Sequence, residues 1–159
     1  MLKTKTRIGL CAAIATAAAA PAVALASSST TISSGKVKAG TVVIASNGLT
    51  LYGFSGDSKN KSTCYGSCAK VWIPLTTKGS VLVKSGSGLN SQLAGKFKRT
   101  NGSYQVTYGG HPLYHFTGDT KPGQQNGQNK KLNGGHWYVV GKSGKFIKPG
   151  SGLVGGYCY

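Results

Sequence analysis

Two short stretches of the chain are rich in β-branched, small or aromatic residues, and a glycine-containing turn and a further apolar run follow each stretch. Residues 41–45 are β-branched or small, and Asn47-Gly48 separates them from an apolar run at 49–54. Residues 104–116 repeat this layout around Gly109-Gly110. A two-residue turn of this composition between apolar runs is typical of a β-hairpin. The pattern therefore predicts two β-hairpins.

The two hairpins belong to an internal repeat with an offset of 62 residues. Its clearest part is Tyr52-Gly53-Phe54-Ser55-Gly56-Asp57, which matches Tyr114-His115-Phe116-Thr117-Gly118-Asp119. The Tyr and Phe of each copy are two residues apart, so in a strand they share a face, and we expect that face to belong to the core. The repeat predicts two related units, repeat 1 at about residues 40–77 and repeat 2 at about residues 102–141.

The rest of the chain consists of short apolar segments separated by glycine-rich turns. Val81-Leu82-Val83 is typical of a further strand, and Leu89 and Leu93 have the spacing of one helical turn. Trp72 and Trp137 hold corresponding positions, with three residues added in repeat 2. The chain has 25 glycines and no long amphipathic helix pattern. We therefore predict an all-β fold in which two tandem antiparallel β-hairpin repeats pack as a small sandwich or barrel, with at most one short helical turn.

The first residues have the composition of a secretory signal peptide. A basic start is followed by an Ala-rich apolar run that ends at Leu25, and Ala24-Leu25-Ala26 is the small-x-small pattern that signal peptidase cleaves. We expect a signal peptide over residues 1–26 and cleavage after Ala26. A membrane anchor is the alternative, but Pro21 interrupts the apolar run. No transmembrane segment is expected in the processed chain.

The segment that follows the predicted cleavage site is polar. Residues 27–38 are rich in Ser and Thr and contain few apolar side chains. Such a segment buries too little apolar surface to offset the entropy of ordering it, so it predicts a flexible tail. The β domain is then expected over residues 39–159.

The processed chain carries charge of almost one sign. Sixteen of the 19 Lys and Arg residues follow Ala26, against two acidic residues, so the positive excess is 14. Such a surface attracts polyanions, and outside a cell these include anionic cell-wall polymers and polysaccharides. The basic residues are scattered, with short clusters at Lys96-Lys98-Arg99 and Lys130-Lys131, and no specific nucleic-acid motif is indicated. A merely solubilising surface is the alternative interpretation.

Several motifs together resemble a known bacterial family. They are the two Tyr-x-Phe-x-x-Asp copies, Ser-Thr-Cys-Tyr-Gly-Ser-Cys-Ala at 62–69, Gln105-Val106-Thr107-Tyr108 with His111-Pro112-Leu113-Tyr114, and His136-Trp137-Tyr138-Val139. The chain is similar, over about residues 40–141, to the secreted-repeat or predicted lipoprotein family with the motif Tyr-x-(Phe/Trp/Tyr)-x-x-Asp. The resemblance implies tandem repeats and an extracytoplasmic location, and it implies no established activity. Cys11 lies too early for a lipobox, so we expect a protein that is secreted freely or held to the envelope by charge.

Two cysteines lie close together in repeat 1. Cys64 and Cys68 are four residues apart, and in a helical or tight loop conformation their Cα atoms are about 6 Å apart, within the range of a disulfide. Export favours oxidation, so we predict a Cys64–Cys68 disulfide with Cys158 left free. The alternative is a metal or redox site on the two thiolates, with copper as the cofactor, because thiolates select soft metals.

The acidic residues Asp57 and Asp119 occupy the same repeat position. Each follows an aromatic strand and a glycine and precedes Ser or Thr and then Lys59 or Lys121. In this context a carboxylate accepts hydrogen bonds from backbone N–H groups two or three residues further on, and a nearby Lys adds an exposed ion pair. The repeat symmetry predicts similar surroundings for both carboxylates.

The sequence supplies little for catalysis. Acid and base chemistry by two carboxylates needs pKa values that are pushed apart, which similar surroundings do not provide, and the chain has no Glu. His111 and His115 are separated by about 13 Å of strand, too far to chelate one ion, and with His136 they are expected to be surface or hydrogen-bonded residues. We therefore predict a secreted, non-catalytic protein without a cofactor that binds the cell envelope or extracellular matrix.

Overall fold

The computed structural model describes residues 28–150, which form twelve strands and two short helices. The strands are β1 (Thr30–Val37), β2 (Gly40–Ala45), β3 (Tyr52–Phe54), β4 (Trp72–Pro74), β5 (Thr76–Thr77), β6 (Val81–Val83), β7 (Ala94–Lys98), β8 (Tyr104–Tyr108), β9 (His111–Pro112), β10 (Tyr114–Phe116), β11 (Lys130–Leu132) and β12 (Gly135–Val139). The helices are α1 (Ser67–Val71) and the 3-10 turn η1 (Ser91–Leu93). The predicted strand at 81–83 is present as β6.

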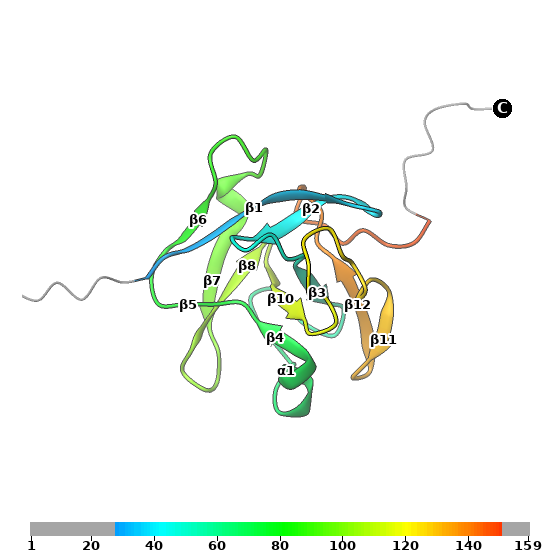
Figure 1. The fold of residues 1–159 in the computed structure, drawn as a ribbon. Coiled ribbons are helices and arrows are strands. Elements are labelled where there is room, and N and C mark those ends of the chain that lie inside the picture. The colour runs from blue at the N-terminus through cyan, green and yellow to red at the C-terminus, as the bar shows by residue number, and fades with distance from the viewer. Residues whose placement is uncertain (1–27, 151–159) are drawn as a thin grey trace, which may run out of the picture.

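The strands form three sheets. Their orders are β2-β1-β6, β11-β12-β3-β10-β4 and β5-β8-β7, and β9 pairs with β8. All pairs are antiparallel except β1 with β6. Figure 1 shows the β1–β2 hairpin lying across the five-stranded sheet, and the sheets curl into a half-barrel. The predicted all-β fold with tandem repeats is confirmed.

Both repeats build the central sheet in the same way. Tyr52 of β3 pairs with Tyr114 of β10 at the middle of the sheet. On either side, β12 pairs with β3 and β4 pairs with β10. Each motif strand, β3 or β10, thus lies between two strands of the other repeat: its motif strand on one side and its Trp-bearing strand on the other. The sequence correspondence of Trp72 with Trp137 is borne out, because Trp72 pairs with Phe116 and Trp137 pairs with Phe54.

The predicted hairpin turns are also present. Gly48 N donates to Ala45 O (2.9 Å) and Ala45 N to Leu49 O (3.0 Å), while Gly109 and Gly110 connect the paired ends of β8 and β9. All three turn glycines have positive φ, between +61° and +81°, which side chains disfavour. After each turn the second strand soon leaves its hairpin and joins the central sheet as β3 or β10.

The prediction of a flexible tail over residues 27–38 is wrong from Thr30 onward. Residues 30–37 form β1, which pairs with β2 on one side and with β6 on the other. Its stability comes from backbone pairing and from one fully buried side chain, Ile32. The composition of the segment therefore misleads, because a strand paired on both sides needs few apolar side chains. The domain begins before residue 39.

Two groups of three residues are each joined by a closed ring of backbone hydrogen bonds, in which every residue donates to the next. In the first ring Leu51 N donates to Val43 O (3.1 Å), Val43 N to Val140 O (2.8 Å), and Val140 N to Leu51 O (3.3 Å). The second ring repeats the pattern at 3.0, 2.8 and 2.9 Å with Leu113, Val106 and Leu75. Each ring takes one member, Val140 or Leu75, from the other repeat. All six residues are buried or half-buried, so neither repeat closes its own core.

The core of the central sheet is a row of four stacked rings, in the order Phe54, Trp137, Trp72 and Phe116. The indoles are parallel within 1° at 3.9 Å, and each Phe ring lies 4.5 Å from the Trp of the other repeat. Tyr52 meets Trp72 edge to face at 5.4 Å, and Tyr114 meets Trp137 at 5.0 Å. Each such pair contributes about 0.5–1.5 kcal/mol beyond its buried area. The expectation that the motif Tyr and Phe face the core is confirmed.

Two expectations fall on residues that the structure does not describe. The signal peptide at residues 1–26 and the free thiol of Cys158 both lie outside residues 28–150. Within the described range, no helix is long and apolar enough to cross a membrane.

Candidate functional site

The motif residues of the two repeats are joined to each other by reciprocal hydrogen bonds. The Tyr52 hydroxyl donates to Asp119 Oδ2 at 2.5 Å, and the Tyr114 hydroxyl donates to Asp57 Oδ2 at 2.6 Å. Each bond joins the Tyr of one repeat to the Asp of the other. The structure therefore brings the six motif residues together at the junction between the repeats.

The second oxygen of each carboxylate fastens the loop that follows it. Asp57 Oδ1 accepts from Thr63 N at 2.7 Å and from Thr63 Oγ1 at 2.9 Å. Asp119 Oδ1 accepts from Asn126 N at 2.9 Å. The donors lie six and seven residues further on, so the prediction of donors two or three residues on is wrong. The acceptor role itself is present, but it organises a wide loop rather than a tight turn.

The turn at each Asp is made by its backbone. Asp57 N donates to Phe54 O at 3.1 Å, and Asp119 N donates to Phe116 O at 3.0 Å. The glycine before each Asp lies under the Phe ring of its own copy, where an added Cβ would meet ring carbon Cε1 at 2.5 Å for Gly56 and 2.4 Å for Gly118. This close approach explains why both copies read Tyr-x-Phe-x-Gly-Asp.

The Asp119 bridge is enclosed. Asp119 is 5% exposed, and the Tyr52 hydroxyl that binds it also accepts from Gly127 N at 3.3 Å. Gly127 leaves no room for a side chain, because an added Cβ would lie 2.7 Å from Trp72. Burial and the adjacent Asp119 carboxylate raise the pKa of Tyr52. Tyr52 therefore remains a hydrogen-bond donor.

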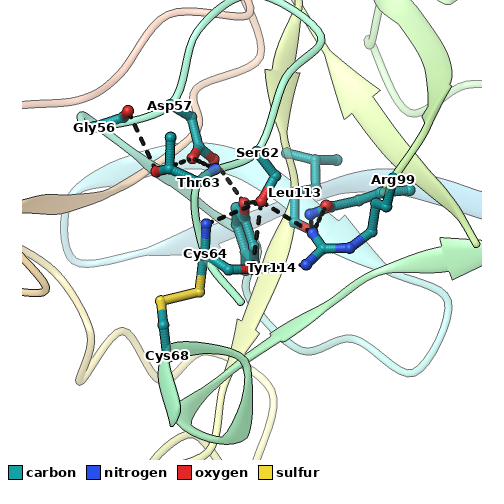
Figure 2. Close-up of a disulfide and its surroundings, with 10 residues drawn as sticks. Gly56, Asp57, Ser62, Thr63, Cys64, Cys68, Arg99, Leu113 and Tyr114 are labelled. Atoms are coloured by element: carbon teal, nitrogen blue, oxygen red, sulfur yellow. Dashed lines mark hydrogen bonds between the residues drawn. A yellow bond between two sulfur atoms is a disulfide. The ribbon is translucent and has the colours of Figure 1, made fainter. Parts of the chain in front are cut away.

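The Asp57 bridge is half-buried and belongs to a larger polar network, which Figure 2 shows. The Tyr114 hydroxyl lies 2.7 Å from Ser62 Oγ, and Ser62 Oγ accepts from Arg99 Nη1 at 3.0 Å. Arg99 is 4% exposed, donates to Cys64 O at 2.6 Å and to Gln105 Oε1, and stacks at 4.2 Å on the ring of Tyr65. This side chain ties repeat 1 to the β7–β8 hairpin of repeat 2.

The pKa values follow from these surroundings. Burial raises the pKa of Asp57 above 3.8, although the Tyr114 hydroxyl, Thr63 and the Arg99 charge oppose the shift. Burial and the Asp57 charge raise the pKa of Tyr114. The hydroxyl groups thus keep their protons, and each of the four carboxylate oxygens in the pair already accepts a hydrogen bond from the protein. Contrary to expectation, the two carboxylates have different surroundings.

The disulfide between Cys64 and Cys68 is present, as predicted, with Cα atoms 5.3 Å apart. Both cysteines are buried and pack in the aromatic core beside Trp72. Figure 2 shows that the bond closes the segment between the Asp57 network and α1. In the chain-entropy account, so short a loop stabilises the fold by about 2 kcal/mol.

The histidines do not come together. The His111 ring packs at 4.1 Å on Phe146, and the His136 ring stacks on Tyr138 at 5.8 Å. Burial lowers the pKa of His111 and of His115. Across residues 28–150, no group of three or more His, Cys, Asp or Glu side chains is arranged to hold a metal ion.

Lysines dominate the charged surface of residues 28–150. All 15 lysines between residues 28 and 150 are exposed, whereas Arg99 is buried. The chain has no acidic side chain beyond the two that bind tyrosines internally. Lys59 and Lys121 are exposed like the rest, and the carboxylates that we expected them to pair with are held by hydroxyl and backbone donors.

Sequence reasoning missed the roles of Ser62, Arg99 and Gln105. The sequence places Arg99 in a basic cluster with Lys96 and Lys98, yet in the structure its guanidinium is buried and donates to Ser62 and Cys64. One signal was available: Arg99 is the single Arg after Ala26, among 15 lysines. A planar guanidinium holds several acceptors in a fixed geometry, which the ammonium of Lys does not.

Residues 33–76 and 95–141 each match a family model described as a secreted repeat of unknown function. The two matches together cover more than half of the chain, and each begins before the repeat boundary that we expected, at β1 or β7. No curated protein and no solved structure matches the chain.

Proposed function

We propose that this chain, which belongs to the family of secreted repeats of unknown function, is a non-catalytic module that binds anionic polymers of the cell envelope or extracellular matrix. The observation that carries the proposal is the one-sided surface. Fifteen lysines reach solvent, while both carboxylates are engaged inside the fold. A uniformly positive surface attracts polyanions and raises the rate at which they associate.

The family motif supports a structural role for the residues that looked most like a site. The polar groups of the motif form hydrogen bonds with one another and with adjacent loops, in Tyr52, Asp57, Tyr114 and Asp119 alike. A catalytic carboxylate needs an oxygen that faces the substrate. The proposal therefore places binding on the lysines and assigns the motif to the fold.

The alternative function is a copper or redox site at Cys64 and Cys68, and the disulfide argues against it. A copper ion would need both sulfur atoms as thiolates, whereas here they are bonded to each other. A redox-active disulfide is usually reachable from solvent, and these cysteines are 1% and 6% exposed. We include export and cleavage after Ala26 in the proposal. A structural disulfide is consistent with export, because disulfides persist in oxidising compartments.

Affinity for a polyanion at graded salt concentration tests the proposal. The processed protein should bind dextran sulfate tightly at 10 mM salt and weakly at 150 mM, because the screening length falls from about 30 Å to about 8 Å. Neutral dextran of the same length is the control and should not bind. Weak binding of dextran sulfate at 10 mM salt would refute the proposal.

A further inference from the structure

A groove lies away from the motif, where the start of β1 meets β5 and the turn before β8. It has a volume of about 590 Å³. Its walls include Thr30, Thr76, Thr77, Lys78, Ser103 and Tyr104. A volume of this size lies within the range of small-molecule binding sites, which is about 300–1,000 Å³. Figure 1 shows β5, β8 and the beginning of β1 converging on this side of the molecule.

Tyr104 distinguishes this groove from the rest of the surface. Its side chain is 41% exposed, whereas Tyr52, Tyr108 and Tyr114 are fully buried. Lys96 Nζ lies 5.1 Å from the centroid of the Tyr104 ring and donates to Gly79 O at 2.6 Å. The ammonium lies over one face of this half-exposed ring, so the ring can offer its other face and the nearby positive charge to one ligand.

The remaining walls add hydroxyl groups and a second positive charge. The Thr30 hydroxyl donates to Thr76 O at 3.1 Å, which joins β1 to β5 at the groove. The Thr76 side chain is exposed there, and so is Lys78. The groove thus combines hydroxyl groups, Lys78 and an aromatic ring that Lys96 contacts, and its lining has no acidic side chain.

The shared repeat fold does not account for this composition. Thr30 precedes the first matched segment, Thr77 and Lys78 fall between the two, and Thr76, Ser103 and Tyr104 lie inside them. At the 62-residue offset Tyr104 corresponds to Val42, which is fully buried, whereas Tyr104 is 41% exposed. A packing role common to both repeats therefore does not explain the exposed Tyr104.

We infer that this groove binds a sugar unit of an anionic polysaccharide, with the sugar ring against Tyr104 and its carboxylate or sulfate near Lys78 and Lys96. The inference rests on the proposed function and narrows it, because it names the ligand class and the place. The sugar ring supplies an apolar face for the tyrosine and hydroxyl groups for the threonines. A polyanion without rings can meet only the lysines.

Calorimetric titration at 50 mM salt with two probes tests the inference. The probes are short dextran sulfate and inorganic polyphosphate of equal charge, and neutral dextran is the blank. The variants are Tyr104→Ala and Lys78→Ala, with Lys121→Ala as a matched control that removes one exposed charge outside the groove. Thermal melts establish that each variant is folded. Tyr104→Ala should weaken dextran sulfate binding about fivefold and leave polyphosphate binding unchanged.

The outcomes separate this inference from the proposed function. Lys78→Ala should weaken dextran sulfate binding more than Lys121→Ala does. If the parent binds but Tyr104→Ala has no effect, or affects both polymers equally, or the two Lys variants are equivalent, the groove is not the site while the proposed function stands. If the parent binds neither polymer, the proposed function fails. Equal binding of neutral dextran would overturn the assignment of an anionic ligand.

Discussion

The two Tyr–Asp bridges have the same geometry and different surroundings. Tyr52 and Asp119 are enclosed, with backbone N–H groups as the other donors. Tyr114 and Asp57 are linked through Ser62 to the buried Arg99, and the disulfide segment lies beside them. Repeat 2 has a polar loop and the β11 hairpin where repeat 1 has α1 and the disulfide.

This difference shows which part of the repeat carries the shared fold. The residues that are alike in both copies form the reciprocal bridges, the stacked rings and the glycine contacts at the junction. The loops that differ between the repeats supply different donors and a different degree of burial to each bridge. The motif therefore couples the repeats, and each repeat supplies what the other needs. We propose that the motif holds the fold together while the lysine surface binds the polyanion.

The largest expected effect comes from deleting each carboxylate. Asp119→Ala removes the acceptor of two donors, the Tyr52 hydroxyl and Asn126 N, at an enclosed site, so we expect a loss of about 3 kcal/mol in unfolding free energy. Asp57→Ala should cost about 1–2 kcal/mol, because Thr63 is exposed and water can replace the acceptor. Urea denaturation measures both. Equal losses would show that the surroundings do not matter.

Asparagine at the same positions should separate the bridges more finely. In Asp57→Asn the Tyr114 hydroxyl can accept from the amide and donate instead to Ser62 Oγ, 2.7 Å away, so we expect a cost below about 1 kcal/mol. In Asp119→Asn the Tyr52 hydroxyl already accepts from Gly127 N, and its proton loses its acceptor, so the cost should be about 1–2 kcal/mol. An Asp57→Asn variant less stable than Asp119→Asn contradicts this reading of the network.

The smallest effect is a pH dependence that belongs to one bridge. Burial raises the pKa of Asp57 in the folded protein, so this group contributes stability that is fully present below its ordinary value of 3.8 and is lost as the pH rises through the raised value. Asp57→Asn does not titrate. The unfolding free energy of the parent relative to Asp57→Asn should therefore fall as the pH rises from 3.8 through the raised pKa of Asp57. The Asp57 charge also acts on the pKa of His111, so both proteins carry His111→Asn in this comparison. A rising difference would contradict the assigned direction.

The sequence predicted the features that periodicity encodes. The hairpins, the core-facing Tyr and Phe of each motif, the paired tryptophans and the Cys64–Cys68 disulfide follow from local spacing and from the 62-residue offset. The strand β1 was missed because its composition is polar. The offset contained the missing signal, since β7 shifted back by 62 residues falls on residues 32–36, inside β1.

The hydrogen-bonded pairing of each motif Tyr with the Asp of the other repeat could not be predicted from the sequence. Local turn chemistry suggested donors close to each Asp, but the Tyr52–Asp119 and Tyr114–Asp57 bonds span 67 and 57 residues. Only the order β12-β3-β10-β4 brings these side chains together. The inward position of Arg99 likewise depends on tertiary contacts with repeat 1.

The most direct test of the central claim is to measure dextran sulfate affinity and stability together for the Tyr52→Phe and Tyr114→Phe variants. Each substitution removes one hydroxyl from a bridge and keeps the ring in the aromatic core. We predict a loss of about 1–2 kcal/mol in unfolding free energy for each variant, larger for Tyr52→Phe, with the affinity of the folded protein unchanged within about twofold. A variant that keeps the parent's stability and loses its affinity for dextran sulfate would show that the motif is the binding site and would contradict the account.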